Sequence, residues 1–111
     1  MNQQENLGII ELSRLFQALS DPTRLQLALL LIDKGPMNVS MISKELKKSQ
    51  SLISHHLSCL RNCGVLKYSK EGQNVYYEIA SKEIKGIILN AIKHVREYGS
   101  GILSCELIGN F

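Results

Sequence analysis

Three cysteines, Cys59, Cys63 and Cys105, are the residues of this sequence with the most distinctive chemistry. Cys59 and Cys63 stand four residues apart in a segment with helical periodicity, so we expect both sulfurs on one helix face, about one turn apart. Two thiolates at that spacing can bind one cation, and thiolate ligands select soft or borderline ions. A third thiolate from Cys105 would complete a three-sulfur site. Cys105 follows Gly99-Ser100-Gly101, which we expect to be a flexible joint.

Two other interpretations of the cysteines remain open. Free cysteines are often buried as small apolar side chains, and thiols can also form a redox switch. A bridge between Cys59 and Cys63 would distort an intact helix, because Cβ atoms four residues apart are about 6 Å from each other and a disulfide prefers about 3.8 Å. Either thiol could instead pair with Cys105.

The composition is that of one small domain with an uneven positive charge. The 111 residues are 44% hydrophobic and carry a formal net charge of +3. Residues 44–71 contain six basic and two acidic side chains, a net charge of +4, which suits a polyanion such as DNA. The sequence has neither a signal peptide nor an apolar run of about 18 residues, so we expect a cytoplasmic protein with reduced thiols and no membrane partner. A Cys-x-x-Cys motif and a nucleophile–base set are both missing, so we expect neither an enzyme nor an organic cofactor.

Periodicity and capping signals predict a mostly helical chain with one β-hairpin. In the second helix Asp21 caps the start, Pro22 takes the first helical position and Gly35 ends the helix. Ser49 caps a later helix that Gly64 ends. The third and fourth helices are joined by a tight turn, which suggests helix-turn-helix. The predicted helices are 5–19, 22–34, 39–47, 50–62 and 82–98, and the strands are 65–69 and 75–79, joined by a loop at 70–74.

The helix over residues 50–62 has one apolar and one polar face. Ile53, Leu57 and Leu60 fall within about 40° of one another on a helical wheel, and His56 lies at the edge of this face as a packed, hydrogen-bonded residue. Small, polar or basic side chains cover the opposite face, as a helix that enters the major groove requires. This polar face, the turn and the hairpin together predict DNA binding. The predicted contacts come from the turn, the helix and the hairpin: Lys48, Ser49, Gln50, Ser51, Ser54, His55, Ser58, Arg61 and Lys70.

The sequence resembles the ArsR/SmtB family of bacterial winged-helix repressors over about residues 10–98. The motifs that carry the resemblance are Leu19-Ser20-Asp21-Pro22-Thr23-Arg24-Leu25, Ser54-His55-His56-Leu57 followed by Leu60, Gly64-Val65-Leu66, and the hairpin around Gly72 and Tyr76. The resemblance implies a winged helix-turn-helix domain at residues 1–98, followed by a tail at 99–111 that holds a possible metal ligand. It also implies a homodimer formed by the first and last helices. The ligand-free dimer would bind operator DNA, and an inducer would release it.

The cysteine pattern is similar to that of the cadmium- and lead-sensing members of this family. The shared segment is Leu57-Ser58-Cys59-Leu60-Arg61-Asn62-Cys63-Gly64. The resemblance implies that Cys59 and Cys63 of one chain and Cys105 of the other bind the inducing ion. Cadmium or lead is the expected inducer, and zinc or arsenite would also suit thiolates. Whether Cys105 would reach its own chain or the partner stays open.

The family also offers a zinc site across the last helices of the dimer, and its positions here read Ser81, Glu83, His94 and Glu97. Glu83, His94 and Glu97 are therefore a weaker candidate second site, because Ser81 cannot replace a carboxylate. Residues 38–47 contain no cysteine, which excludes the family's site in the first helix of the turn motif. Two other functions stay open: a redox-sensing repressor of the same fold, and a thiol or metal carrier that does not bind DNA.

Overall fold

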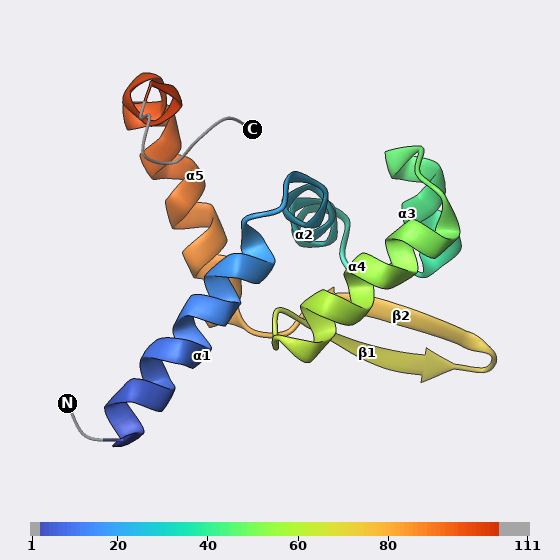
Figure 1. Ribbon diagram of the computed structural model, residues 1–111. Helices are drawn as coiled ribbons and strands as arrows, with labels where there is room; N and C mark the ends of the chain where they lie inside the picture. Colours follow the sequence, from blue (N-terminus) through green and yellow to red (C-terminus); the bar gives the residue numbers. More distant parts are fainter. Residues whose placement is uncertain (1–2, 105–111) are drawn as a thin grey trace. The chain divides into compact units, whose positions relative to one another are not determined.

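The computed structural model describes the backbone of residues 3–104 and the side chains of residues 8–104, so Cys105 lies outside the described residues. The chain divides into two compact units, Met1–Ser81 and Lys82–Phe111. Among residues 3–104, the first unit contains four helices and a two-stranded hairpin, and the second contains one long helix (Figure 1). This element order confirms the winged helix-turn-helix prediction.

Helices α1 (Gln3–Leu19) and α2 (Pro22–Lys34) are separated by a short capped turn. The Asp21 carboxylate accepts a hydrogen bond of 2.9 Å from the backbone N–H of Arg24, which satisfies one of the free donors at the start of α2. Gly35 ends α2 with a φ of 78°. Leu27, Ala28 and Leu31 are buried on α2, so this helix lies at the centre of the first unit.

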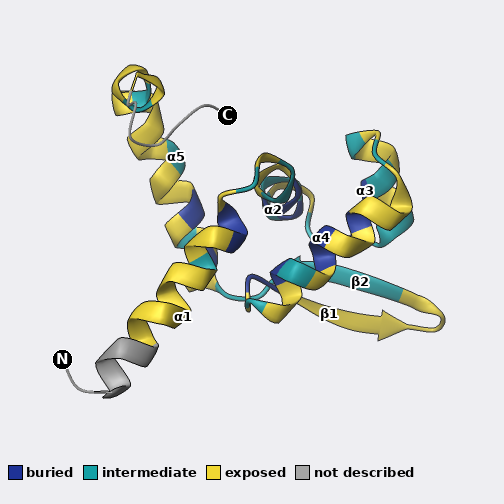
Figure 2. Ribbon diagram, in the orientation of Figure 1, coloured by how far each residue is buried: buried dark blue, intermediate teal, exposed yellow. Residues whose placement is uncertain are grey.

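Helices α3 (Val39–Leu46) and α4 (Gln50–Asn62) form the helix-turn-helix. Asn38 and Ser49 cap them: Asn38 Oδ1 accepts from the Met41 N–H at 2.9 Å and Ser49 Oγ from the Leu52 N–H at 3.2 Å. Lys47 makes the tight turn in a left-handed conformation. Buried segments lie on α2, α3 and α4 (Figure 2). Four side chains of α3 and α4 are completely buried: Ile42, Ile53, Leu57 and Leu60.

The hairpin consists of β1 (Leu66–Glu71) and β2 (Asn74–Ile79), paired antiparallel from Leu66↔Ile79 to Glu71↔Asn74. The expected five-residue loop is wrong, because the pairing continues to a two-residue turn at Gly72-Gln73. Gly72 has a φ of 62°, a conformation that such tight turns require and that glycine adopts without a steric cost. A bridge between Met37 and Tyr77 ties β2 to the segment before α3.

Helix α5 (Lys82–Leu103) is longer than expected. The predicted end at Tyr98 is wrong, and Gly99-Ser100-Gly101 is part of the helix instead of a flexible joint. Each glycine costs about 1 kcal/mol relative to alanine in a helix, which weakens the helix but does not end it as proline would. None of the described helices is long and apolar enough to cross a bilayer.

Candidate functional site

Cys59 and Cys63 lie in the last turn and at the C-cap of α4. Both are free thiols and half-buried. The backbone N–H of Cys63 donates to the Cys59 carbonyl at 3.1 Å, and Gly64, with a φ of 77°, turns the chain toward β1. The end of the helix therefore holds the two side chains on one side of α4, as the four-residue spacing predicted.

The two thiols also interact with each other. Burial raises the pKa of the Cys63 thiol, and the neighbouring Cys59 raises it further through its charge and a side-chain hydrogen bond, while the Arg24 charge acts in the opposite direction. Cys63 therefore favours its protonated form, so a metal ion must displace a proton to bind its sulfur.

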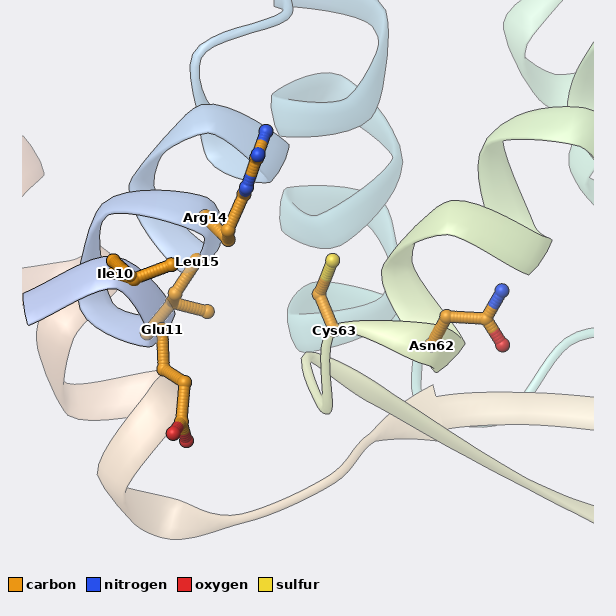
Figure 3. A pocket seen from close by; sticks show the side chains of 6 residues that line it. All are labelled: Ile10, Glu11, Arg14, Leu15, Asn62 and Cys63. Atoms are coloured by element: carbon orange, nitrogen blue, oxygen red, sulfur yellow. The ribbon is translucent and has the colours of Figure 1, made fainter. Parts of the chain in front are cut away.

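Two cavities open beside these thiols. A cavity of about 270 Å³ is lined by Arg14, Gln17, Ala18, Arg24, Cys59 and Cys63. A second, of about 290 Å³, is lined by Ile10, Glu11, Arg14, Leu15, Asn62 and Cys63 (Figure 3). In Figure 3 the Cys63 sulfur and the Arg14 side chain point to the same end of the cavity, and the Glu11 carboxylate lies at the opposite end. Both cysteines thus have open space against α1.

The donor set fits a thiophilic ion in part. Two sulfurs face one cavity, as a shared cation requires, and thiolates are the ligands that soft ions prefer. Among residues 8–104 no group of three or more His, Cys, Asp or Glu side chains could hold a metal. A third protein ligand would have to come from outside the described residues or from a second chain.

Arg24 connects three helices beside this site. Its Nε donates to the Ala18 carbonyl at 2.6 Å and its Nη2 to the Gln17 carbonyl at 3.3 Å, at the end of α1. Its Nη1 lies 3.5 Å from Nδ1 of His56 on α4. His56 is 8% exposed, which confirms the expected packed, hydrogen-bonded histidine. No local sequence pattern indicates these contacts of the Arg24 side chain, although a position three residues after the capping Asp21 predicts the hydrogen bond of its backbone N–H.

The expected polar face of α4 is present. Ser49, Gln50, Ser51, Ser54, His55, Ser58 and Arg61 are exposed, as is Lys70 on β1, and Lys48 is half-buried. The Arg61 guanidinium lies 5.1 Å from the ring centroid of Tyr68 on β1, a cation–π distance. Tyr68 was not identified from the sequence. It attaches the end of α4 to the hairpin.

The second candidate site is not assembled within the described part of one chain. Glu83, His94 and Glu97 are all exposed on α5, and Glu83 and His94 are about 16 Å apart along a helix axis. The His94 ring stacks on Tyr98 with centroids 4.6 Å apart. A site that includes Glu83 therefore needs a partner chain and stays a prediction.

Comparisons with known proteins agree with this architecture. The family model of bacterial regulatory proteins of the arsR family matches residues 21–68. A cadmium resistance transcriptional regulatory protein, the CadC homolog of Staphylococcus aureus, is 36% identical over 91 residues, which are 82% of this chain and 75% of that protein. The transcriptional regulator CmtR of Mycobacterium tuberculosis is 38% identical over 73 residues, 66% of this chain and 61% of its own length.

A solved structure has the same fold. It is a homodimeric winged helix-turn-helix DNA-binding domain from Mycobacterium bovis, described as a possible ArsR-family transcriptional regulator. It superposes with a TM-score of 0.79 over 88% of this chain and 89% of that one, at 22% sequence identity.

Proposed function

Because this chain belongs to the arsR family of bacterial regulatory proteins, we propose that it is a repressor whose metal-free homodimer binds operator DNA and is released by a thiophilic ion. Cys59 and Cys63 are the proposed ligands, with Cys105 as the third. The observation that carries the proposal is the pair of half-buried thiols on α4, the predicted DNA-contacting helix, which open together onto one cavity.

Cadmium or lead is the proposed inducer. Both are soft ions that suit thiolate ligands, and zinc or arsenite are weaker candidates. The name of the S. aureus relative, a cadmium resistance regulator, supports cadmium. A redox signal has less support, because the pKa of Cys63 is raised by burial and reactive cysteines have lowered pKa values.

The exposed face of α4 is the proposed DNA-reading surface. It is polar or basic, and the hairpin beside it carries Lys70 near its tip. In a dimer, each α4 would enter one major groove, with half-sites about one helical turn, or a multiple of it, apart. A protein with this function works in the cytoplasm, where its DNA is.

Homodimerisation is supported by apolar side chains that the fold leaves at the surface. On α1 the exposed set is Ile9, Ile10, Leu12 and Phe16, and on α5 it is Ile87, Leu89, Val95, Tyr98 and Leu103. Helix faces of this kind indicate an interaction surface. We propose that both helices take part in the dimer interface, in line with the homodimeric neighbour from M. bovis.

The proposed mechanism follows from the position of the thiols. An ion bound to Cys59 and Cys63 constrains the last turn of α4 without occupying its polar face. It therefore changes how α4 is held against α1 and α2, where Arg24 contacts both α1 and His56. Release requires that the ion bind the non-DNA-binding arrangement more tightly, and the coupling is reciprocal. Operator DNA should thus weaken metal binding by the same factor.

Absorption titration of the reduced protein with Cd(II), Pb(II), Zn(II) and As(III) tests the ligands. We expect sulfur-to-metal charge-transfer bands that Cys59→Ser and Cys63→Ser abolish and Cys105→Ser weakens. Ser58→Ala is the control, since this neighbour is exposed and lines neither cavity. Unchanged bands in the Cys59→Ser, Cys63→Ser double variant would reject the site.

An operator titration tests the regulation. Metal-free protein should bind its operator more tightly than Cd(II)-loaded protein, and the two cysteine substitutions should remove the difference. Equal affinity of the two forms would contradict the proposed release.

A further inference from the structure

We infer that Arg24 positions the DNA-reading helix α4 through a hydrogen bond to His56 that forms only while the imidazole of His56 is neutral. Operator binding therefore weakens when the pH falls, and no metal ion takes part. The inference rests on the proposed function in one respect, because it takes the exposed face of α4 as the surface that binds operator DNA.

One guanidinium group connects three helices of the first unit. Arg24 belongs to the first turn of α2. Its Nε and Nη2 donate to the carbonyls of Ala18 and Gln17 at the end of α1, at 2.6 and 3.3 Å. Its Nη1 lies 3.5 Å from Nδ1 of His56 on α4. Because the guanidinium group is planar and rigid, this one half-buried side chain sets where His56 lies relative to α1 and α2.

The chemistry of the Arg24–His56 pair decides the protonation state of the histidine. A guanidinium group has five N–H donors and no acceptor, and it keeps its charge. The imidazole nitrogen that faces it must therefore accept, so we assign the proton of neutral His56 to Nε2 from this contact. Protonation of Nδ1 removes the acceptor and places two positive charges against each other. The hydrogen bond and a charged His56 thus exclude each other.

Burial and the surrounding charges favour the same neutral state. His56 is 8% exposed. Burial is the largest cause that lowers the pKa of His56, and the charges of Arg24, of His55 on α4 and of Lys48 in the turn lower it further. Asp21 at the start of α2 opposes them, but its carboxylate already accepts a hydrogen bond of 2.9 Å from the backbone N–H of Arg24.

His56 and the predicted DNA contacts are parts of the same rigid helix. The buried side of α4 carries His56 and Leu57, and the exposed side carries His55 and Ser58. Successive residues of a helix are about 100° apart, so the two sides move together. A charged His56 regains water only if α4 rotates or moves away from α2. Either movement displaces the side chains that are proposed to contact the major groove.

The sign of the pH effect follows from linkage. DNA selects the arrangement in which His56 is neutral, whereas a shifted α4 allows His56 to bind a proton. Affinity for DNA therefore falls as the pH drops below about 6.5, by at most about tenfold per pH unit for each proton. His55 acts in the opposite direction, because it is exposed on the DNA-reading face and its protonation adds a positive charge near the phosphates.

The test removes the opposing histidine and then compares two proteins. The probe is a DNA duplex that full-length, reduced and chelator-treated His55→Gln protein selects from random sequence at pH 7.5. Fluorescence anisotropy measures its binding between pH 7.5 and 5.5 at constant ionic strength, over the range in which circular dichroism shows unchanged folding. The comparison protein is the double variant His55→Gln, His56→Asn, whose amide oxygen can accept from Arg24 and cannot titrate.

We expect the affinity of His55→Gln for the duplex to fall about three- to tenfold over this range, while that of the double variant changes less than about twofold. His94 is present in both proteins, so its titration cancels. An equal pH dependence in the two proteins would overturn the inference.

Two further measurements address the hydrogen bond itself. Nitrogen-15 NMR of the parent imidazoles at pH 7.5 should show His56 with its proton on Nε2, and a proton on Nδ1 would reject the contact without any variant. Arg24→Gln should weaken binding of a duplex selected by the parent protein at pH 7.5 and move the pKa of His56 toward its usual value. The matched control Arg96→Gln, an exposed residue of α5, should change neither.

Failure of this inference and failure of the proposed function give different results. If the protein selects no duplex, DNA binding itself fails. If a duplex binds at pH 7.5 but the double variant keeps the pH dependence, or Arg24→Gln binds the duplex as tightly as the parent, the positioning role of Arg24 is rejected and DNA binding stands.

Discussion

At the scale of single residues, His56 and Asp21 link stability to pH through their contacts with Arg24. Burial lowers the pKa of His56 from its usual 6.5; the charges of Arg24, His55 and Lys48 lower it further, and Asp21 opposes them. The backbone hydrogen bond from Arg24, together with the positive charge of its side chain, lowers the pKa of Asp21 below 3.8. Both groups are therefore protonated more readily in the unfolded chain than in the folded one.

The lowered pKa values of His56 and Asp21 fix the direction in which stability changes with pH. Stability rises with pH wherever the unfolded state binds more protons. We expect the free energy of unfolding to fall as the pH drops below about 6.5, where unfolded His56 becomes charged, and to fall again below about 3.8 because of Asp21. Urea unfolding of His56→Gln should lack the first decrease. His94→Gln, which changes an exposed histidine of α5, should keep it, and an identical loss in both variants would contradict the assignment.

Arg24 is predicted to matter for its shape as well as its charge. Arg24→Lys keeps the charge but loses the planar fork that reaches two carbonyls and His56. We expect a loss of about 1–3 kcal/mol in the free energy of unfolding, as hydrogen bonds to charged groups are worth about 1.5–3 kcal/mol each. Urea denaturation measures this loss. The control Arg96→Lys should stay within about 0.5 kcal/mol of the parent, and an equally small effect of Arg24→Lys would reject the role.

At the scale of elements, helix caps set the position of α4. Ser49→Ala removes the hydrogen bond to the Leu52 N–H and should lower stability by about 1 kcal/mol. Ser58→Ala in the exposed middle of the same helix should be neutral or slightly stabilising, because alanine has the higher helix propensity. Thermal unfolding followed by circular dichroism compares the two, and equal melting temperatures would show that the cap contributes nothing.

The contact between Arg61 and Tyr68 joins α4 to the hairpin. Arg61 can therefore affect DNA binding directly, through a phosphate contact, or indirectly, by holding the hairpin in place. If Arg61 contacts a phosphate, Arg61→Gln should weaken operator binding and reduce the salt slope by about one. Tyr68→Leu removes only the ring beneath Arg61, so it should weaken binding while the slope stays unchanged. Fluorescence anisotropy over a salt series measures both. An unchanged slope for Arg61→Gln would mean that this residue acts through the hairpin alone.

At the scale of the whole molecule, the exposed apolar side chains of α1 and α5 are expected to be covered in a dimer. Phe16→Asp places a charge on α1, where the parent side chain is 51% exposed. We expect it to convert the dimer to a monomer in light scattering and to abolish operator binding, since a single half-site contact is weak. Met41→Asp on α3, a side chain 44% exposed, is the matched control and should leave the dimer intact. A dimeric Phe16→Asp protein would exclude this part of α1 from the interface.

The sequence by itself determined the features that depend only on residues close to one another along the chain. The caps at Asp21 and Ser49, the start of α2 at Pro22 and the two-faced α4 are local, because capping and helical periodicity act within one turn. The placing of Cys59 and Cys63 on one side of α4 follows from the same period. For this reason the helix-turn-helix motifs and the shared side of Cys59 and Cys63 agree with the structure, while metal binding by the two cysteines stays a prediction.

The tertiary structure decided which residues from distant parts of the chain contact these helices. Arg24 and His56 are 32 residues apart in sequence, and Tyr68 reaches Arg61 only because β1 turns back after Gly64. The cavities beside the cysteines exist because α1 packs against α4, which no local pattern specifies. The longer strands and the helical Gly99-Ser100-Gly101 also differ from expectation. In the hairpin, cross-strand pairing extends as far as Glu71 and Asn74. In α5, cooperative helical hydrogen bonding outweighs the low propensity of glycine, and both effects depend on the whole element.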